Sequence, residues 1–194
     1  MATCISRSPE DTTALGEHWG QAARPGWVLG LSGELGAGKT QLVKGLARGL
    51  GFPGRVHSPT FALVNSYAGG RLPLVHLDLY RLETAEEIAA AGLEEFLRDG
   101  SGVTVIEWAE RWFGSAASRE PNPLTPSLLP SDEESVAKPG EGSGGFTASG
   151  RGLPKAVDPS AEPNPLELPA RWRQVQIEIL SETERRIVYE DLGA

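Results

Sequence analysis

Residues 33–40 read Gly-Glu-Leu-Gly-Ala-Gly-Lys-Thr, which is the pattern G-x-x-x-x-G-K-[ST]. The glycines permit positive φ angles and a close approach of the backbone to an anion, so that exposed N–H groups form a concave nest. The helix expected after the stretch adds its positive N-terminal end. Lys39 can reach the β- and γ-phosphates, and the Thr40 hydroxyl can ligate Mg²⁺. The stretch therefore predicts a site for a nucleoside triphosphate.

The flanks have the structure that this motif requires. Residues 27–31 are mostly apolar and predict a buried strand. Residues 40–50 predict a helix with one apolar face, and Gly51 followed by Pro53 ends it. With both flanks correct, a chance match by a glycine-rich turn is a poor explanation of the pattern.

The composition predicts one compact domain with a flexible part. Of 194 residues, 39% are hydrophobic, and the chain has 24 glycines and 15 prolines. The net charge of −8 argues against a large nucleic-acid-binding surface. The single cysteine, Cys4, excludes an intrachain disulfide, and we expect it to be inert in a frayed terminus. Because no apolar signal region or membrane-length apolar run occurs, we expect a cytoplasmic protein.

The remaining periodicity predicts further helices and strands. A helix should start near Ser8 and close at residues 24–26, and another should start with a capping box from Thr84 to Glu87. We expect strands at residues 61–67, 72–78 and 103–108, a short helix at 92–97, and an antiparallel hairpin formed by 172–180 and 185–189.

Two of the predicted strands end in acids. Asp78 closes one, and such an acid beside a phosphate loop holds the metal directly or through water. Glu107 lies at the end of another and could ligate Mg²⁺, polarise the attacking water or simply face solvent. Ser58 and Thr60 are candidates for a loop that responds to the γ-phosphate, although an ordinary turn explains them equally well. His76, within an apolar strand, is better explained as a packed core residue.

Residues 114–169 differ from the rest of the chain. They hold ten of the 15 prolines and little apolar periodicity, which predicts a disordered insertion. The expected domains are thus an ATPase core at 1–113, the insertion at 114–169, and a hairpin at 170–194 that completes the core.

Four ordered motifs carry a family resemblance: the stretch at 33–40, Ser-Pro-Thr-Phe at 58–61, His-Leu-Asp-Leu-Tyr-Arg at 76–81 and Ile-Glu-Trp at 106–108. Together they resemble the bacterial tRNA threonylcarbamoyladenosine biosynthesis ATPase family, TsaE. The resemblance covers residues 8–113 and, more weakly, the final hairpin. With the predicted elements it implies an α/β P-loop NTPase fold, a three-layer sandwich with a mostly parallel central sheet and a C-terminal antiparallel hairpin.

The resemblance also implies an activity and partners. TsaE-like proteins bind the TsaD–TsaB complex and hydrolyse ATP there in support of threonylcarbamoylation of adenosine 37 in tRNAs that read ANN codons. The tRNA would be contacted only through that complex. Because no arginine finger is evident in the sequence, we expect slow intrinsic turnover that a partner activates.

The family's site residues transfer to this sequence in three groups. Lys39, Asp78 and Glu107 would be catalytic, and Mg²⁺ would be held by Thr40, Asp78 and Glu107. The nucleotide would contact Thr12, Glu34, Leu35, Gly36, Ala37, Gly38, Lys39, Thr40, Gln41, Ser58, Thr60 and Trp108.

Two rival functions use the same phosphate-binding motif. A small-molecule kinase would need an arginine-rich lid, of which only Arg81 is a candidate. A nucleotide-dependent switch without turnover would not need two acids at one edge of the sheet. The sequence lacks an Asn-Lys-x-Asp guanine-reading motif, which favours ATP over GTP.

Overall fold

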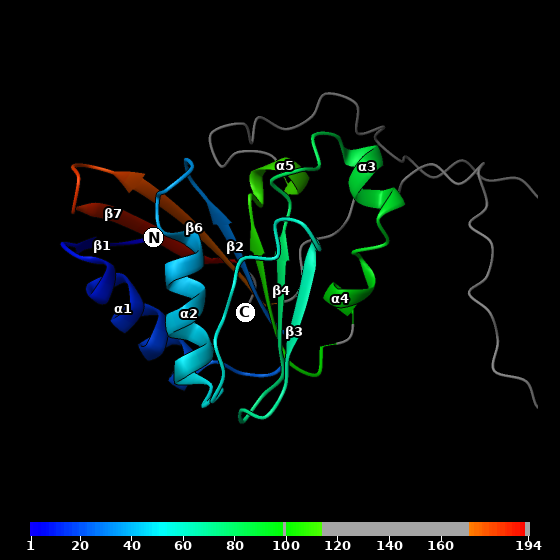
Figure 1. Ribbon diagram of the computed structural model, residues 1–194, viewed down its shortest axis with the longest axis horizontal. Helices are drawn as coiled ribbons and strands as arrows, with labels where there is room; N and C mark the ends of the chain where they lie inside the picture. The colour runs from blue at the N-terminus through cyan, green and yellow to red at the C-terminus, as the bar shows by residue number, and fades with distance from the viewer. Residues whose placement is uncertain (99, 114–170, 193–194) are drawn as a thin grey trace, which may run out of the picture. The chain divides into compact units, whose positions relative to one another are not determined.

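The computed structural model describes residues 1–98, 100–113 and 171–192. The predicted insertion at 114–169 lies outside the described residues, so the domain limits remain predictions. The described strands form one sheet in the order β1-β7-β6-β2-β5-β4-β3 (Figure 1). Their bounds are β1 (Ala2–Ser6), β2 (Trp27–Ser32), β3 (Val64–Tyr67), β4 (Leu74–Asp78), β5 (Val103–Glu107), β6 (Trp172–Ile179) and β7 (Arg185–Leu192).

The sheet is mixed: the predicted parallel arrangement holds for its four central strands, β6, β2, β5 and β4, and antiparallel pairs flank them on both sides. β2 pairs in parallel with β5 and β6, and β4 pairs in parallel with β5. The other three pairs, β1–β7, β6–β7 and β3–β4, are antiparallel. The predicted hairpin accounts for one of these. β1 was not predicted, because it is a short and mostly exposed strand that, among the described strands, pairs only with β7. Cys4 therefore lies in a strand and not in a frayed end.

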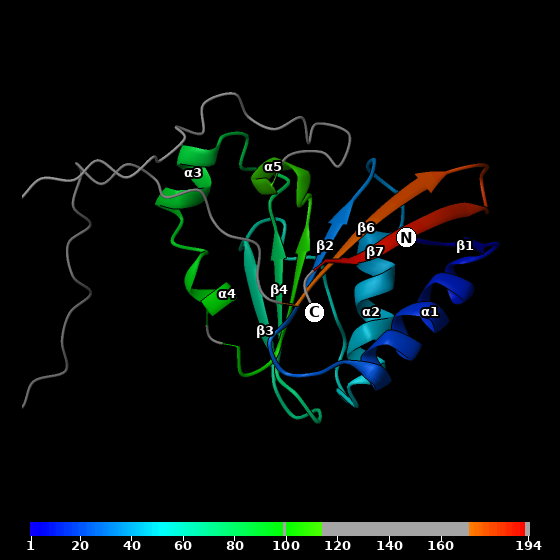
Figure 2. The same ribbon diagram turned by 180° about the vertical axis from the view of Figure 1, so that it is seen from behind.

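Helices cover both faces of the sheet, as expected for three layers (Figures 1 and 2). Side chains of β2 alternate between them: Leu29 and Leu31 pack toward α1 (Pro9–Ala22) and α2 (Lys39–Gly49), whereas Val28 packs toward the other face. That second face is covered by α3 (Ala85–Ala90), α4 (Glu95–Arg98) and α5 (Glu110–Phe113). No helix among the described residues is long and apolar enough to cross a membrane.

The two helices of the first face touch through glycines. A Cβ added to Gly16 or Gly20 of α1 would lie 2.2 or 2.3 Å from a carbonyl oxygen of α2, and one on Gly45 or Gly49 would lie 2.0 or 2.1 Å from a carbonyl oxygen of α1. Only glycine permits backbones to approach this closely. This contact holds α1 beside α2, whose first residues adjoin the motif at 33–40.

Local signals mostly placed the elements correctly, with shifts that have a physical cause. Ser8 caps α1 by accepting from the Asp11 N–H, and the predicted capping box at Thr84 is present. The strand predicted from residue 61 begins only at Val64, because the N–H of Leu63, which has φ of 64°, bonds to the carbonyl of Pro59 and closes a turn.

Candidate functional site

The glycine-rich loop, residues 33–38, joins the end of β2 to the start of α2. Gly33, Gly36 and Gly38 have φ angles of 141°, 79° and 104°, so the predicted conformation is confirmed. Gly38 is the N-cap of α2 and has no side chain to bond the first N–H groups of the helix. Backbone donors and the positive end of α2 therefore point into the loop, which suits an anion.

Lys39 is folded back on this loop. Its ammonium donates to the carbonyls of Gly33 at 2.6 Å and Glu34 at 2.9 Å, and lies 3.7 Å from the centroid of the Trp108 ring. Burial lowers the pKa of Lys39 below its ordinary value, although Glu107 and other nearby acids act in the opposite direction. The charge is thus held by carbonyl dipoles and an indole face.

Trp108 covers the lysine from a strained backbone. Its φ is 62°, a left-handed conformation that costs a non-glycine residue about 1–3 kcal/mol. The ring also lies 5.3 Å from the Tyr80 ring and 5.4 Å from the Arg111 guanidinium. These contacts offset the strain and hold the indole beside the glycine-rich loop.

The two predicted acids lie side by side. Asp78 of β4 is in register with Glu107 of β5, and both are at most 3% exposed. Asp78 accepts hydrogen bonds from the hydroxyls of Ser58 and Thr60, both at 2.6 Å. Glu107 accepts from the Thr40 hydroxyl at 2.8 Å. The structure therefore brings together the motif and the three other predicted segments.

The oxygen atoms at this edge fit a hard divalent cation. Two carboxylates and the Thr40 hydroxyl are the donor types that Mg²⁺ prefers. Within the described residues neither Asp78 nor Glu107 forms an ion pair with Lys or Arg. Buried carboxylates that no Lys or Arg pairs with are costly, and a bound cation would offset that cost. Thr40, Glu107 and Asp78 could hold such a cation.

His76 takes part in this arrangement, although sequence reasoning assigned it to the core. It is fully buried, as expected, but its Nε2 lies 2.8 Å from Oε1 of Glu107. Nδ1 has no hydrogen-bond partner among the described residues. The signal was present in the sequence, since His76 is two residues before Asp78 and strand residues two apart share a face.

Arg185 is a second residue that the sequence did not reveal. It begins β7, and its guanidinium donates to the carbonyls of Ala37 at 3.2 Å and Gly36 at 3.4 Å. It also donates to three carbonyls of the β6–β7 turn. The C-terminal hairpin thus braces the glycine-rich loop, a contact that only the folded chain creates.

The other predicted contacts surround the loop. A hollow of about 360 Å³ is lined by Thr12, residues 36–38, Gln41 and Arg185. The Thr12 hydroxyl is buried and lies 2.7 Å from that of Ser6, whereas the Gln41 amide donates to Thr13. Glu34 and Leu35 are exposed on the loop. Arg81, the one lid candidate, lies 5.7 Å from the Phe61 ring.

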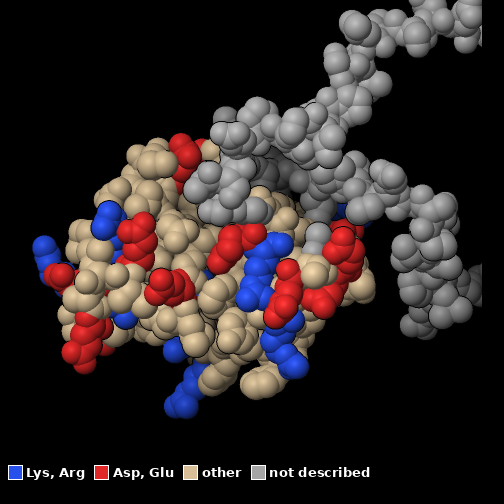
Figure 3. Space-filling model, turned by 90° about the horizontal axis from the view of Figure 1, so that it is seen from above, with Lys and Arg blue, Asp and Glu red and all other residues tan. Residues whose placement is uncertain are grey.

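Charges of both signs lie at the end of the sheet toward which β2, β4 and β5 run (Figure 3). Figure 3 looks down on this end, and basic and acidic side chains are mixed on its visible part.

Most of this core is similar to a known protein family. A family model described as threonylcarbamoyl adenosine biosynthesis protein TsaE matches residues 6–130. The chain belongs to the TsaE family. The matched range holds the glycine-rich loop, both acids and His76, whereas Arg185 of this TsaE-family chain lies outside it.

Two relatives, both named tRNA threonylcarbamoyladenosine biosynthesis protein TsaE, show how far the similarity extends. The one from Bacillus subtilis is 47% identical over 102 residues, which are 53% of this chain and 63% of that protein, a little under two thirds. The one from Treponema pallidum is 48% identical over 108 residues, which are 56% of this chain and 78% of that protein. The crystal structure of Bacillus subtilis YdiB aligns with a TM-score of 0.59 and 26% identity, covering 99% of this chain and 86% of that one.

Proposed function

We propose that this protein is a P-loop NTPase that hydrolyses ATP with Mg²⁺ in the cytoplasm, as part of threonylcarbamoyladenosine synthesis on tRNA. The observation that carries the proposal is the convergence of the glycine-rich loop, Lys39, Thr40, Asp78 and Glu107 at one edge of the sheet. Loop donors would cradle the phosphates, which is the main requirement of phosphoryl transfer. Mg²⁺, when bound, would neutralise phosphate charge.

When ATP binds, several site residues would exchange their present hydrogen-bond partners for phosphate oxygens. Lys39 would leave the carbonyls of Gly33 and Glu34 and donate to the phosphates. The hydroxyls of Ser58 and Thr60, which now donate to Asp78, are the groups best placed to respond to a γ-phosphate. Since these exchanges occur between well-formed hydrogen bonds, their net cost is small.

Partner activation is the second part of the proposal. Arg185 is committed to carbonyl groups of the glycine-rich loop and of the β6–β7 turn, so it is not free to act as an arginine finger. Leu35 and Phe61 are 72% and 89% exposed beside the site, and exposed apolar side chains favour a protein partner. From the family resemblance we propose that the partner is the TsaD–TsaB complex, with tRNA contacted through it.

The test is phosphate release from ATP by the full chain, alone and with TsaD–TsaB. We expect slow release that rises with the pair, is abolished by Lys39→Ala and is unchanged by Lys44→Ala, a matched removal of an exposed lysine from the same helix. Glu107→Ala should abolish release and leave ADP binding measurable. A nucleotide that binds but never turns over would favour the switch, and no response to the pair would refute partner activation.

A further inference from the structure

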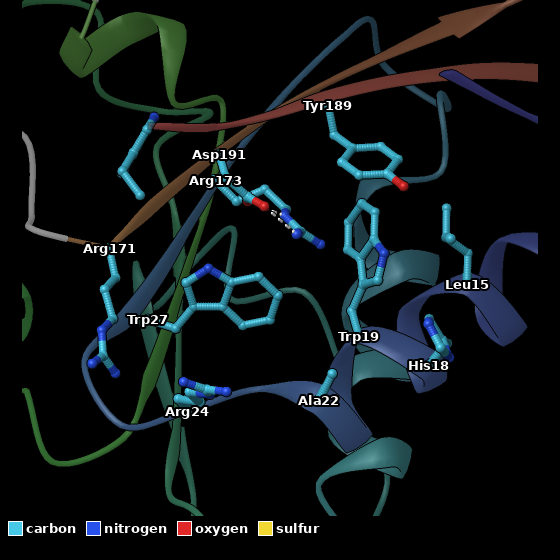
Figure 4. Close-up of a pocket in the computed structure, with 11 residues that line it drawn as sticks. Leu15, His18, Trp19, Ala22, Arg24, Trp27, Arg171, Arg173, Tyr189 and Asp191 are labelled. Atoms are coloured by element: carbon cyan, nitrogen blue, oxygen red, sulfur yellow. Dashed lines mark hydrogen bonds and ion pairs between the residues drawn. The ribbon is translucent and has the colours of Figure 1, made fainter. Parts of the chain in front are cut away.

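A second hollow lies at the opposite end of the sheet from the glycine-rich loop. It has a volume of about 540 Å³ and is formed between the C-terminal half of α1 and the ends of β2, β6 and β7 (Figure 4). Trp27, the first residue of β2, lines it, whereas the glycine-rich loop follows the last residue of that strand. Nothing in the proposed ATPase cycle uses this hollow.

The inner wall of the hollow is an aromatic cluster built around one arginine. The Arg173 guanidinium lies 4.6 Å from the centroid of the Trp27 ring, 4.8 Å from that of Trp19 and 4.9 Å from that of Tyr189. It donates to both carboxylate oxygens of Asp191, at 2.5 and 2.6 Å. The Arg173 charge is therefore neutralised, and the rings are held in place before any ligand arrives.

The rim of the hollow carries positive charge that none of the described acids neutralises. Arg24 and Arg171 are exposed and form no ion pair with any described residue. Arg171 donates to the carbonyl of Pro25, next to Arg24, and Figure 4 shows both arginines on the Trp27 side of the hollow. Among the described residues that line the hollow, Asp191 is the one acid, and it is already bound to Arg173. In a chain with a net charge of −8, this local excess of cations points to an anionic ligand.

We propose that this hollow binds a nucleotide unit, with its base against Trp27 and its phosphate at Arg24 and Arg171. A base offers a π-face that stacks on an indole, and guanidinium groups match phosphate oxygens in geometry. The volume is in the range of small-ligand sites. An apolar helix of a partner protein fits the hollow less well, because it would leave Arg24 and Arg171 without an anionic partner. The nucleotide can be free or part of single-stranded RNA, since both present the same chemistry.

The test uses the full chain with Lys39→Ala, which weakens binding of di- and triphosphates at the glycine-rich loop, and dependence of the remaining binding on Arg24, Arg171 and Trp27 assigns that binding to this hollow. Binding of AMP is measured by calorimetry, and binding of a short fluorescein-labelled oligoadenylate by anisotropy. Adding Arg24→Glu and Arg171→Glu should raise the Kd at least about tenfold, since two phosphate contacts are lost. Trp27→Leu should raise it as well.

The matched control reverses two exposed arginines outside the hollow, Arg55→Glu and Arg98→Glu, with the same change in net charge. It should leave the Kd within about twofold. Binding of AMP supports a free nucleotide, and binding of oligoadenylate alone supports RNA. Absence of both, equal losses in the control, or tighter binding of polyglutamate than of oligoadenylate would overturn the proposal.

Discussion

Gly45→Ala should destabilise the protein, although alanine is the better helix former. The added Cβ would lie 2.0 Å from the carbonyl oxygen of Thr13, whereas carbon and oxygen normally approach to about 3.3 Å. The helices must therefore separate by roughly 1.3 Å. Both atoms belong to backbone, so no side chain can rotate away. Replacing Gly16, which approaches Leu42 in the same way, should act alike.

The expected size follows from two opposing terms. Alanine in a helix is favoured over glycine by about 1 kcal/mol, and overpacking a core costs about 1–3 kcal/mol. Because the clash is rigid, we place the cost at the upper end and expect a net loss of about 1–2 kcal/mol. With a urea dependence of about 2 kcal/mol per M, the midpoint should fall by about 0.5–1 M.

Urea unfolding followed by circular dichroism measures this loss, and ADP titration measures its effect on the site. Thr12 of α1 faces Gly38, with its methyl carbon 3.9 Å from where a Cβ there would lie, so displacement of α1 should also weaken ADP binding. Lys44→Ala, at an exposed position of the same helix, should change stability by less than about 0.5 kcal/mol. A Gly45→Ala protein as stable as the wild type would refute the close backbone contact.

Two further predictions concern His76 and Asp191. His76→Leu fills a similar buried volume but removes the hydrogen-bond partner of Glu107. ADP binding in the presence of Mg²⁺ should therefore weaken about 10–100-fold, while ADP binding without Mg²⁺ is retained. His76→Gln should restore part of it, and equal losses with and without Mg²⁺ would contradict a positioning role. The hydrogen bond from Arg173 lowers the pKa of Asp191, so this pair stabilises the fold above the unfolded-state pKa of about 3.9, and the effect is lost as pH falls through the folded-state pKa. Asp191→Asn should therefore lower the free energy of unfolding in urea by at most about 1 kcal/mol at neutral pH, because the carboxylate is largely exposed. This loss should become smaller as the pH falls. A loss that grows in acid would contradict this origin.

Local signals in the sequence were sufficient wherever one short segment determines its own conformation. The glycines of residues 33–38 adopt the positive φ angles that the motif requires, and the caps at Ser8 and Thr84 lie where predicted. The acids at strand ends were also predictable, because parallel strands present their carboxyl ends at one edge. Each of these features depends on residues close by in the sequence or on the direction in which a single strand runs.

Only the tertiary structure decided which distant residues meet. Arg185 braces the glycine-rich loop from a hairpin at the other end of the chain, and His76 meets Glu107 across two strands. The edge strand β1 and the helix contact through Gly45 depend on a partner surface, as does the cluster around Arg173. Periodicity in a sequence indicates which face of a helix or strand is apolar. It does not indicate which other element packs against that face, because this depends on how the whole chain packs.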